Sequence, residues 1–259
     1  MIVEGSVALV TGANRGLGRE IVRALLAGGA SKVYAATRHP SAVADLADAG
    51  GGRVVPVALD ITDDAQVAQA AARCTDVTLL VNNAGVNRNA AFLAAPGLDA
   101  AREEIATNYF GPLAMCRAFA PVLKSNAAAG GRGASDGVSG GGAIVNVLSI
   151  LAKATLPVMG SLCASKAAAL RMTEGVRAEL AAQGTLVVAV MTGALDTDMS
   201  RDFQGPKSQP AEVAQAIVAA LARGEEDVYV GPMPEWVNGA LQSDAKGLEK
   251  ELAKALPGA

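Results

Sequence analysis

Short apolar runs alternate with longer Ala- and Leu-rich segments along the chain. Strands are expected in the short runs, at residues 6–12, 32–38, 53–60, 77–85, 142–149, 185–191 and 227–231. Several of these runs are apolar without alternation, as is typical of strands that helices cover on both faces. Helices are expected in the longer segments, at residues 16–28, 63–73, 98–123, 161–182 and 210–223. The repeated strand–helix order predicts a doubly wound α/β fold with a mainly parallel sheet of about seven strands.

One segment, residues 125–142, interrupts this order. It reads SNAAAGGRGASDGVSGGG and has almost no apolar side chain to bury, so a flexible surface loop is expected. A linker between two domains is the alternative, but the strand that follows is needed to complete the sheet begun before it. No internal repeat of about 20–50 residues is found. We therefore expect a single domain over residues 1–259.

The composition restricts the kinds of function to consider. With 51% hydrophobic but only 3% aromatic residues, the core must be built from Ala, Val, Leu and Ile. A formal net charge of −3 gives no basic surface for nucleic acid, and no apolar run approaches the roughly 18 residues of a membrane span. The first residues also lack the pattern of a secretory signal. We expect a cytoplasmic protein without nucleic-acid or membrane partners.

Metal and thiol chemistry are not indicated. Cys74, Cys116 and Cys163 are far apart in the chain and form no CxxC pair, so reduced thiols are expected. The single histidine, His39, precedes Pro40 in an expected loop, which gives no basis for a His-based triad or a multi-histidine metal site.

A glycine-rich turn follows the first expected strand and opens the first expected helix. Gly12, Gly16 and Gly18 would permit a tight turn and let backbone N–H groups approach a diphosphate at the positive end of that helix. Glycines that only allow close packing of helix on strand are the alternative. The position of the turn between strand and helix favours dinucleotide binding in a Rossmann-type domain.

From Thr11 to about Tyr229 the chain resembles the short-chain dehydrogenase/reductase family, whose glycine turn has the form TGxxxGxG. The matching segments are TGANRGLG (11–18), LDITD (59–63), NNAG (82–85), ATNYFG (106–111), IVNVLS (144–149), ASK (164–166) and TGALDTDM (192–199). Their order and spacing together make the resemblance specific. It implies a cofactor-binding set of Gly12, Asn14, Arg15, Gly16, Leu17, Gly18, Arg38, Asp60, Ile61, Asn82, Ala84, Gly85, Lys166, Gly193, Leu195 and Thr197.

The charges near the second strand indicate which cofactor would bind. An acid is usual there when ribose hydroxyls are bound, whereas a 2′-phosphate needs a cation. This chain has Arg38 after the strand and Arg15 in the glycine turn, which favours NADP(H) because arginine binds phosphate by charge-assisted hydrogen bonds. An ordinary solvated charge is the alternative for Arg38.

The resemblance also implies catalytic roles. In the family, the serine at Ser149 orients a carbonyl, the lysine at Lys166 binds the nicotinamide ribose, and the asparagine at Asn108 holds a water path. The tyrosine that transfers the proton stands four residues before the lysine, and here that residue is Leu162. Tyr34, Tyr109 and Tyr229 are poorly placed to replace it.

Three interpretations of Leu162 are open. The chain could be a natural or engineered variant with weakened proton transfer, a reductase of an iminium ion or activated alkene that needs no tyrosine acid, or a protein that binds NADP(H) without turnover. Two further features do not decide between these interpretations. Thr192 stands where the family usually has proline, and Cys163 has no histidine nearby in sequence to activate it.

We therefore expect an NADP(H)-dependent oxidoreductase that transfers hydride to or from a small or medium apolar carbonyl compound. An imine or alkene reductase and a non-catalytic NADP(H)-binding protein are the alternatives. Residues 193–210 are expected to form a substrate lid. The resemblance implies a homodimer or homotetramer through the helices at 98–123 and 161–182.

Overall fold

The structure, a computed structural model, describes residues 3–129 and 142–256. Seven strands form one sheet in which every pairing is parallel, in the order β3-β2-β1-β4-β5-β6-β7. The strands are β1 (Val7–Thr11), β2 (Lys32–Thr37), β3 (Val54–Ala58), β4 (Leu79–Asn82), β5 (Ala143–Val147), β6 (Leu186–Thr192) and β7 (Asp227–Val230). The expected doubly wound parallel sheet is confirmed. Each strand lies within its expected run except β6, which continues one residue further, to Thr192.

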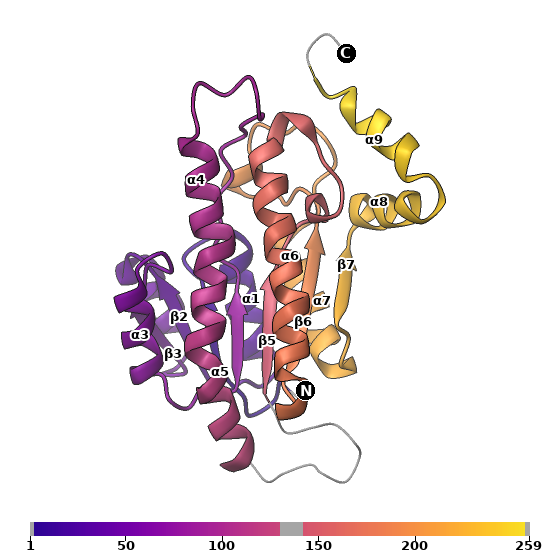
Figure 1. The fold of residues 1–259 in the computed structure, drawn as a ribbon. Helices are drawn as coiled ribbons and strands as arrows, with labels where there is room; N and C mark the ends of the chain where they lie inside the picture. Colours follow the sequence, from indigo (N-terminus) through magenta and orange to yellow (C-terminus); the bar gives the residue numbers. More distant parts are fainter. Residues whose placement is uncertain (1–2, 130–141, 257–259) are drawn as a thin grey trace.

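Helices cover both faces of this sheet (Figure 1). They are α1 (Gly16–Ala27), α2 (Ala44–Ala49), α3 (Asp64–Arg73), α4 (Asp99–Ile105), α5 (Gly111–Ala129), α6 (Gly160–Leu180), α7 (Pro210–Arg223), α8 (Pro232–Ser243) and α9 (Ala245–Ala253). Strand β1 shows why the strands read as unbroken apolar runs. Ala8 and Val10 pack in one core with α1 and α7, whereas Leu9 packs in the opposite core with α3 and α5. Both faces of the sheet are therefore buried.

The long helix expected at 98–123 is divided. Between α4 and α5 lies a π-helical turn, Ala106–Phe110, and Asn108 stands in its middle. Helix α5 also continues to Ala129, so the loop expected at 125–142 begins later than the sequence suggested. Asn126 explains the extension, because its Nδ2 donates hydrogen bonds of 2.9 Å to the carbonyls of Thr75 and Val77. The remainder of that expectation, 130–141, lies outside the described residues.

Helices α8 and α9 extend the chain beyond β7 and were not among the expected helices. Val237, Leu248 and Leu252 bury their side chains in a core that includes Leu170 of α6. Among the helices that the structure describes, none is long and apolar enough to cross a membrane.

The carboxyl ends of β1, β4, β5 and β6 lie at one edge of the sheet, because parallel strands all end there. The segments that follow these strands line one pocket of about 1230 Å³. Strand order reverses between β1 and β4, and ligands of open α/β sheets bind at such a point. The fold thus places the glycine turn and the carboxyl ends of β5 and β6 around the same pocket.

Candidate active site

The glycine turn between β1 and α1 has the backbone geometry that its sequence requires. Gly12 and Gly16 have φ of +66° and +51°, a region that side chains disfavour. A Cβ on Gly18 would lie 2.2 Å from the carbonyl oxygen of Gly12, so only glycine fits there. Asn83 secures the turn from the neighbouring loop, since its Nδ2 donates to the carbonyl of Thr11 at 2.9 Å and to that of Gly12 at 3.3 Å. The N-terminus of α1 has no side-chain cap and no acidic residue in its first turn, which leaves an anion-binding end.

Two arginines lie at this end of the pocket. Arg15 forms an exposed ion pair of 3.5 Å with Asp198, and Arg38 lines the pocket after β2. Glu103 also lines the pocket, but its carboxylate accepts a 2.6 Å hydrogen bond from Nε of Arg88. The Arg88 guanidinium, with a smaller contribution from Arg38, holds the pKa of the Glu103 carboxyl below its ordinary value. This carboxylate is therefore already paired with Arg88, which leaves positive charge at Arg38.

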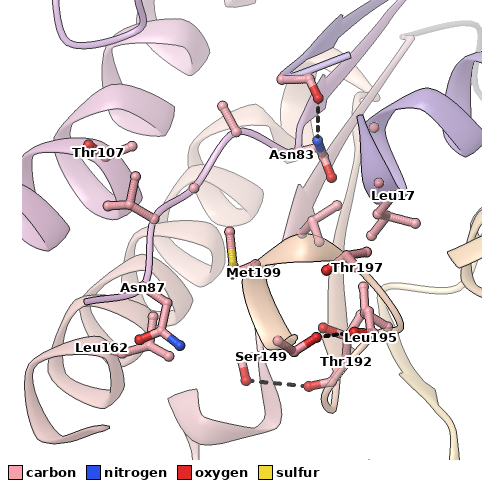
Figure 2. Close-up of a pocket in the computed structure, with 18 of the residues that line it drawn as sticks. Leu17, Asn83, Asn87, Thr107, Ser149, Leu162, Thr192, Leu195, Thr197 and Met199 are labelled. Carbon is pink, nitrogen blue, oxygen red and sulfur yellow. Dashed lines mark hydrogen bonds between the residues drawn. The ribbon is translucent and has the colours of Figure 1, made fainter. Parts of the chain in front are cut away.

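At the other end of the pocket lie the serine and the lysine. Ser149 ends the segment after β5, and its hydroxyl donates to the carbonyl of Thr192 at a long 3.3 Å (Figure 2). Lys166 projects from α6, and its Nζ donates to the carbonyl of Val147 at 3.0 Å. Burial lowers the pKa of the Lys166 ammonium to about 8. The site thus combines a weakly engaged hydroxyl with a cation that can lose its proton near neutral pH.

Asn108 lies behind the pocket rather than on its surface. Its carboxamide accepts from the backbone N–H of Val86 and donates to the carbonyl of Val86, both at 2.9 Å, and also donates to Oγ of Ser165 at 3.0 Å. The side chain is 1% exposed. In this structure Asn108 therefore joins the π-helical turn, the segment after β4 and helix α6.

Leu162 occupies the wall one helical turn before Lys166. The side chain is 8% exposed and packs with Leu151 and Cys163, with Met159 and Met233 against this cluster. None of the three tyrosines, all within the described part of the chain, lines the pocket. This part of the pocket wall is therefore apolar.

Cys163 and Thr192 have structural surroundings. The Cys163 thiol lies 3.6 Å from the carbonyl oxygen of Leu156 and 3.4 Å from its backbone nitrogen, and burial raises its pKa. A thiol held protonated is a poor nucleophile. Thr192 donates from Oγ1 to the carbonyl of Leu148 at 3.3 Å, while its own carbonyl accepts from Ser149.

The structure brings most of the predicted site residues to this one pocket. Those that line it are Gly12, Asn14, Arg15, Gly16, Leu17, Gly18, Arg38, Asp60, Ile61, Ala84, Gly85, Ser149, Leu162, Lys166, Gly193, Leu195 and Thr197. Asn82 does not line it, because its Nδ2 donates to Oδ1 of Asn146 at 2.8 Å inside the sheet. The expected lid, 193–210, contains a short 3-10 turn, Asp198–Ser200, and ends where α7 begins at Pro210.

Sequence reasoning missed several lining residues. They are Asn83, Asn87, Arg88, Glu103, Thr107, Leu156, Met159, Met199, Phe203 and Met233. The position of Asn87, two residues after the NNAG segment, was an available signal. Met233 follows β7 and carried none, because nothing in the sequence indicates that α8 begins beside the pocket.

Comparison with known proteins agrees with this geometry. The sequence model of the family described as short chain dehydrogenase matches residues 6–207. A crystal structure of a short chain dehydrogenase from Burkholderia cenocepacia in complex with NADP is 50% identical, with a TM-score of 0.88 over 97% of this chain and 99% of that one. Dehydrogenase/reductase SDR family member 7B from Bos taurus is 29% identical over 90% of this chain and 75% of that protein. The short chain dehydrogenase tazN from Aspergillus terreus is 30% identical over 92% of this chain but 51% of its own length.

The chain belongs to the short-chain dehydrogenase family.

Proposed function

We propose that the protein is an NADP(H)-dependent oxidoreductase that transfers hydride to or from a small or medium apolar carbonyl compound. The observation that carries this proposal is a single pocket, which joins a glycine turn and two arginines at one end to Ser149 and Lys166 at the other. The Burkholderia relative in complex with NADP supports the choice of cofactor.

The residues present fit an NADP(H) molecule. Gly12 and Gly16 have the positive φ that the turn needs, Gly18 lets the turn pack closely against α1, and the uncapped N-terminus of α1 suits a diphosphate. Arg15 and Arg38 would hold the 2′-phosphate, and Lys166 would hold the nicotinamide ribose. When bound, the cofactor supplies or accepts the hydride.

The substrate end of the pocket is apolar. Leu151, Leu156, Met159, Leu162 and Met233 line it. Such a wall favours an apolar body on the substrate, and the Ser149 hydroxyl is the polar group that would orient the carbonyl oxygen. Its present hydrogen bond to Thr192 is long enough to be exchanged easily for one to a substrate.

The proton for the substrate oxygen needs a source other than tyrosine. Lys166 lies in the pocket one helical turn from Leu162, and its ammonium has a pKa of about 8. We assign the proton to this ammonium. Reduction of a carbonyl would then add one hydride and one proton, convert Lys166 to the amine, and end with its reprotonation from solvent.

A second function is favoured by Leu162 itself. Hydride addition to an iminium ion needs no acid, because the C=N π electrons become the nitrogen lone pair and so neutralise the positive charge. The apolar side chain of Leu162 is compatible with such a substrate. A protein that binds NADP(H) without turnover remains the third possibility.

Turnover assays test these possibilities. NADPH oxidation is followed with matched ketone, imine and enone panels, for wild type, Ser149→Ala and Lys166→Met. Ketone reduction that is lost in both variants supports the proposal. Imine turnover alone would favour the second function, and NADPH binding without turnover of any panel would favour the third.

We also propose a homodimer or homotetramer through α4–α5 and α6. Phe110, which is 57% exposed in the turn between α4 and α5, is available for such a contact. Light scattering on wild type and Phe110→Lys tests it, and a wild-type monomer would contradict it.

A further inference from the structure

Residues 86–90 lie between β4 and α4 without regular secondary structure, and residues 86–89 line the pocket. Hydrogen bonds from other segments hold the backbone at every second residue of this stretch. Asn108 binds Val86, Oε1 of Glu104 accepts from the N–H of Arg88 at 2.6 Å, and the carbonyl of Ala90 accepts from both N and Oγ of Ser161 at 3.2 Å. Asn87, which lies between Val86 and Arg88, turns its side chain toward the pocket (Figure 2).

The Asn87 carboxamide is held in place. Its Oδ1 accepts from the backbone N–H of Asn89 at 2.9 Å, and its Nδ2 donates to Oδ1 of Asn89 at 3.0 Å. Asn89 has φ of +50°, a conformation that asparagine tolerates better than most residues. The other partner of Nδ2 is the sulfur of Met159 at 3.9 Å, which is a weak acceptor. A carbonyl oxygen would be a stronger acceptor for this second N–H.

Among the residues that form these hydrogen bonds, Glu104 is unusual. It is 0% exposed, and its Oε2 has no hydrogen-bond partner among the described residues. The side chain of Arg88 pairs instead with Glu103. A buried acceptor without a partner costs free energy, so its presence needs an explanation. The explanation offered by the contacts is that Glu104 fixes the backbone of residue 88, and with it the neighbouring Asn87.

We propose that Asn87 is a substrate-binding residue, whose amide N–H donates a hydrogen bond to the substrate oxygen on the side where Leu162 has no hydroxyl. Met159 contacts Asn87 and packs against the cluster of Leu162, which puts the amide beside that leucine. Ser149 lines the same pocket, where its hydroxyl is hydrogen-bonded to the carbonyl of Thr192 (Figure 2). Two neutral donors then orient the oxygen, and Glu104 is the positioning residue behind one of them. The inference rests on the proposed function.

The first test measures binding without turnover. The probe is acetophenone, an apolar ketone with one acceptor oxygen, titrated into the complex of the protein with NADP+ by ligand-observed NMR. In Asn87→Ala we expect affinity to fall by about threefold to tenfold, the loss of one hydrogen bond, with an unchanged dissociation constant for NADP+. Ethylbenzene, which lacks the oxygen, should bind both proteins equally.

Three results would overturn the assignment. The first is a wild-type protein that does not bind acetophenone, and the second is an affinity of Asn87→Ala for acetophenone within about twofold of the wild-type value. The third is equal weakening of acetophenone and ethylbenzene binding, which would mean that Asn87 has a packing role. Failure of the proposed function is distinguishable from these. It would appear as acetophenone binding that depends on Asn87 while no ketone is reduced.

The second test concerns Glu104. Glu104→Gln keeps an acceptor for the Arg88 N–H, and Glu104→Leu removes it. We expect Gln to retain the acetophenone affinity and Leu to reduce it about as much as Asn87→Ala does, with no further loss in the double variant Glu104→Leu/Asn87→Ala. Additive losses would contradict the positioning role.

Hydrogen exchange in the wild-type protein tests the role of Glu104 even if the Glu104→Leu variant does not fold. The backbone amide of Arg88 should exchange at least about a hundredfold more slowly than a free amide, because Glu104 accepts its hydrogen. An unprotected Arg88 amide would refute the positioning role without any variant.

Discussion

Replacing Leu162 by tyrosine tests the reasoning about proton transfer most directly. Leu162 and Lys166 lie one turn apart on α6 and both line the pocket. A phenol on residue 162 would therefore lie near the Lys166 ammonium, whose charge would lower the pKa of the phenol. The hydroxyl would supply the acid that the leucine lacks.

Two features of the structure limit the expected gain in activity: the acid function of Lys166 and the packing around Leu162. A positioned general acid typically contributes about 10²–10⁴-fold, and Lys166 already supplies part of this, so we expect ketone reduction to rise by about 10²-fold. The ring must also fit where the leucine is only 8% exposed, among Leu151, Cys163, Met159 and Met233. Overpacking of this cluster would cost about 1–3 kcal/mol of unfolding free energy. Because one side of Leu162 faces the pocket, we expect the lower part of that range.

The assay compares wild type, Leu162→Tyr and Leu162→Phe. The phenylalanine variant carries the ring without the hydroxyl, so it separates the steric effect from the chemical one. Steady-state ketone reduction, the dissociation constant for NADPH, and urea unfolding are measured on all three. We expect tyrosine alone to raise kcat, both variants to bind NADPH as wild type does, and both to be destabilised to a similar extent.

One result would refute the reasoning. If Leu162→Tyr is folded and binds NADPH but reduces no ketone faster than Leu162→Phe, the missing phenol does not limit this protein. The iminium and non-catalytic alternatives would then gain. A loss of imine turnover in both variants would show that the leucine shapes the pocket for its native substrate.

Three further predictions concern cofactor choice, pH and stability. Arg38→Ala should reduce the preference for NADPH over NADH by about tenfold or more in fluorescence titrations, and an unchanged ratio would disprove the phosphate assignment. Wild-type ketone reduction should be constant below pH about 8 and fall above it, since burial lowers the pKa of Lys166 to about 8 and only the ammonium can donate; a flat profile to pH 10 would exclude Lys166 as the acid. Asn146→Ala should lower the free energy of unfolding in urea by about 1–3 kcal/mol, because it leaves Asn82 and Thr173 without their buried partner, and a smaller loss would show that those groups find others.

The sheet and the glycine turn could be predicted because their signals are local. Several strands are apolar on both faces, and β1 shows this with Ala8 and Val10 on one side and Leu9 on the other. Gly12 and Gly18 are required by the backbone of the turn itself. The same holds for the start of α7, where Pro210 and a capping box mark the first turn.

The parts that could not be predicted depend on contacts between distant segments. Helix α5 extends to Ala129 because Asn126 reaches carbonyls about fifty residues earlier, at Thr75 and Val77. The pair Glu103 and Glu104 shows the same limit at a finer scale. Adjacent helical residues point about 100° apart, and here one lies exposed against Arg88 while the other is fully buried. The sequence, with two adjacent glutamates, gave no indication of which one would hydrogen-bond to the backbone of the pocket wall.

Under the proposed function, the two halves of the pocket would make unequal contributions to catalysis, and this decides how much a leucine rather than a tyrosine at residue 162 matters. Orientation of two reactants can supply about 7–11 kcal/mol of barrier reduction, whereas one general acid supplies about 3–5 kcal/mol. The groups that would orient cofactor and substrate, from the glycine turn to Ser149, are all present around one pocket. Leu162 removes only the smaller contribution, and the Lys166 ammonium can restore part of it. An active reductase, slower on simple ketones and better on substrates that need little acid assistance, is therefore a more economical interpretation of this pocket than a protein that only binds NADP(H).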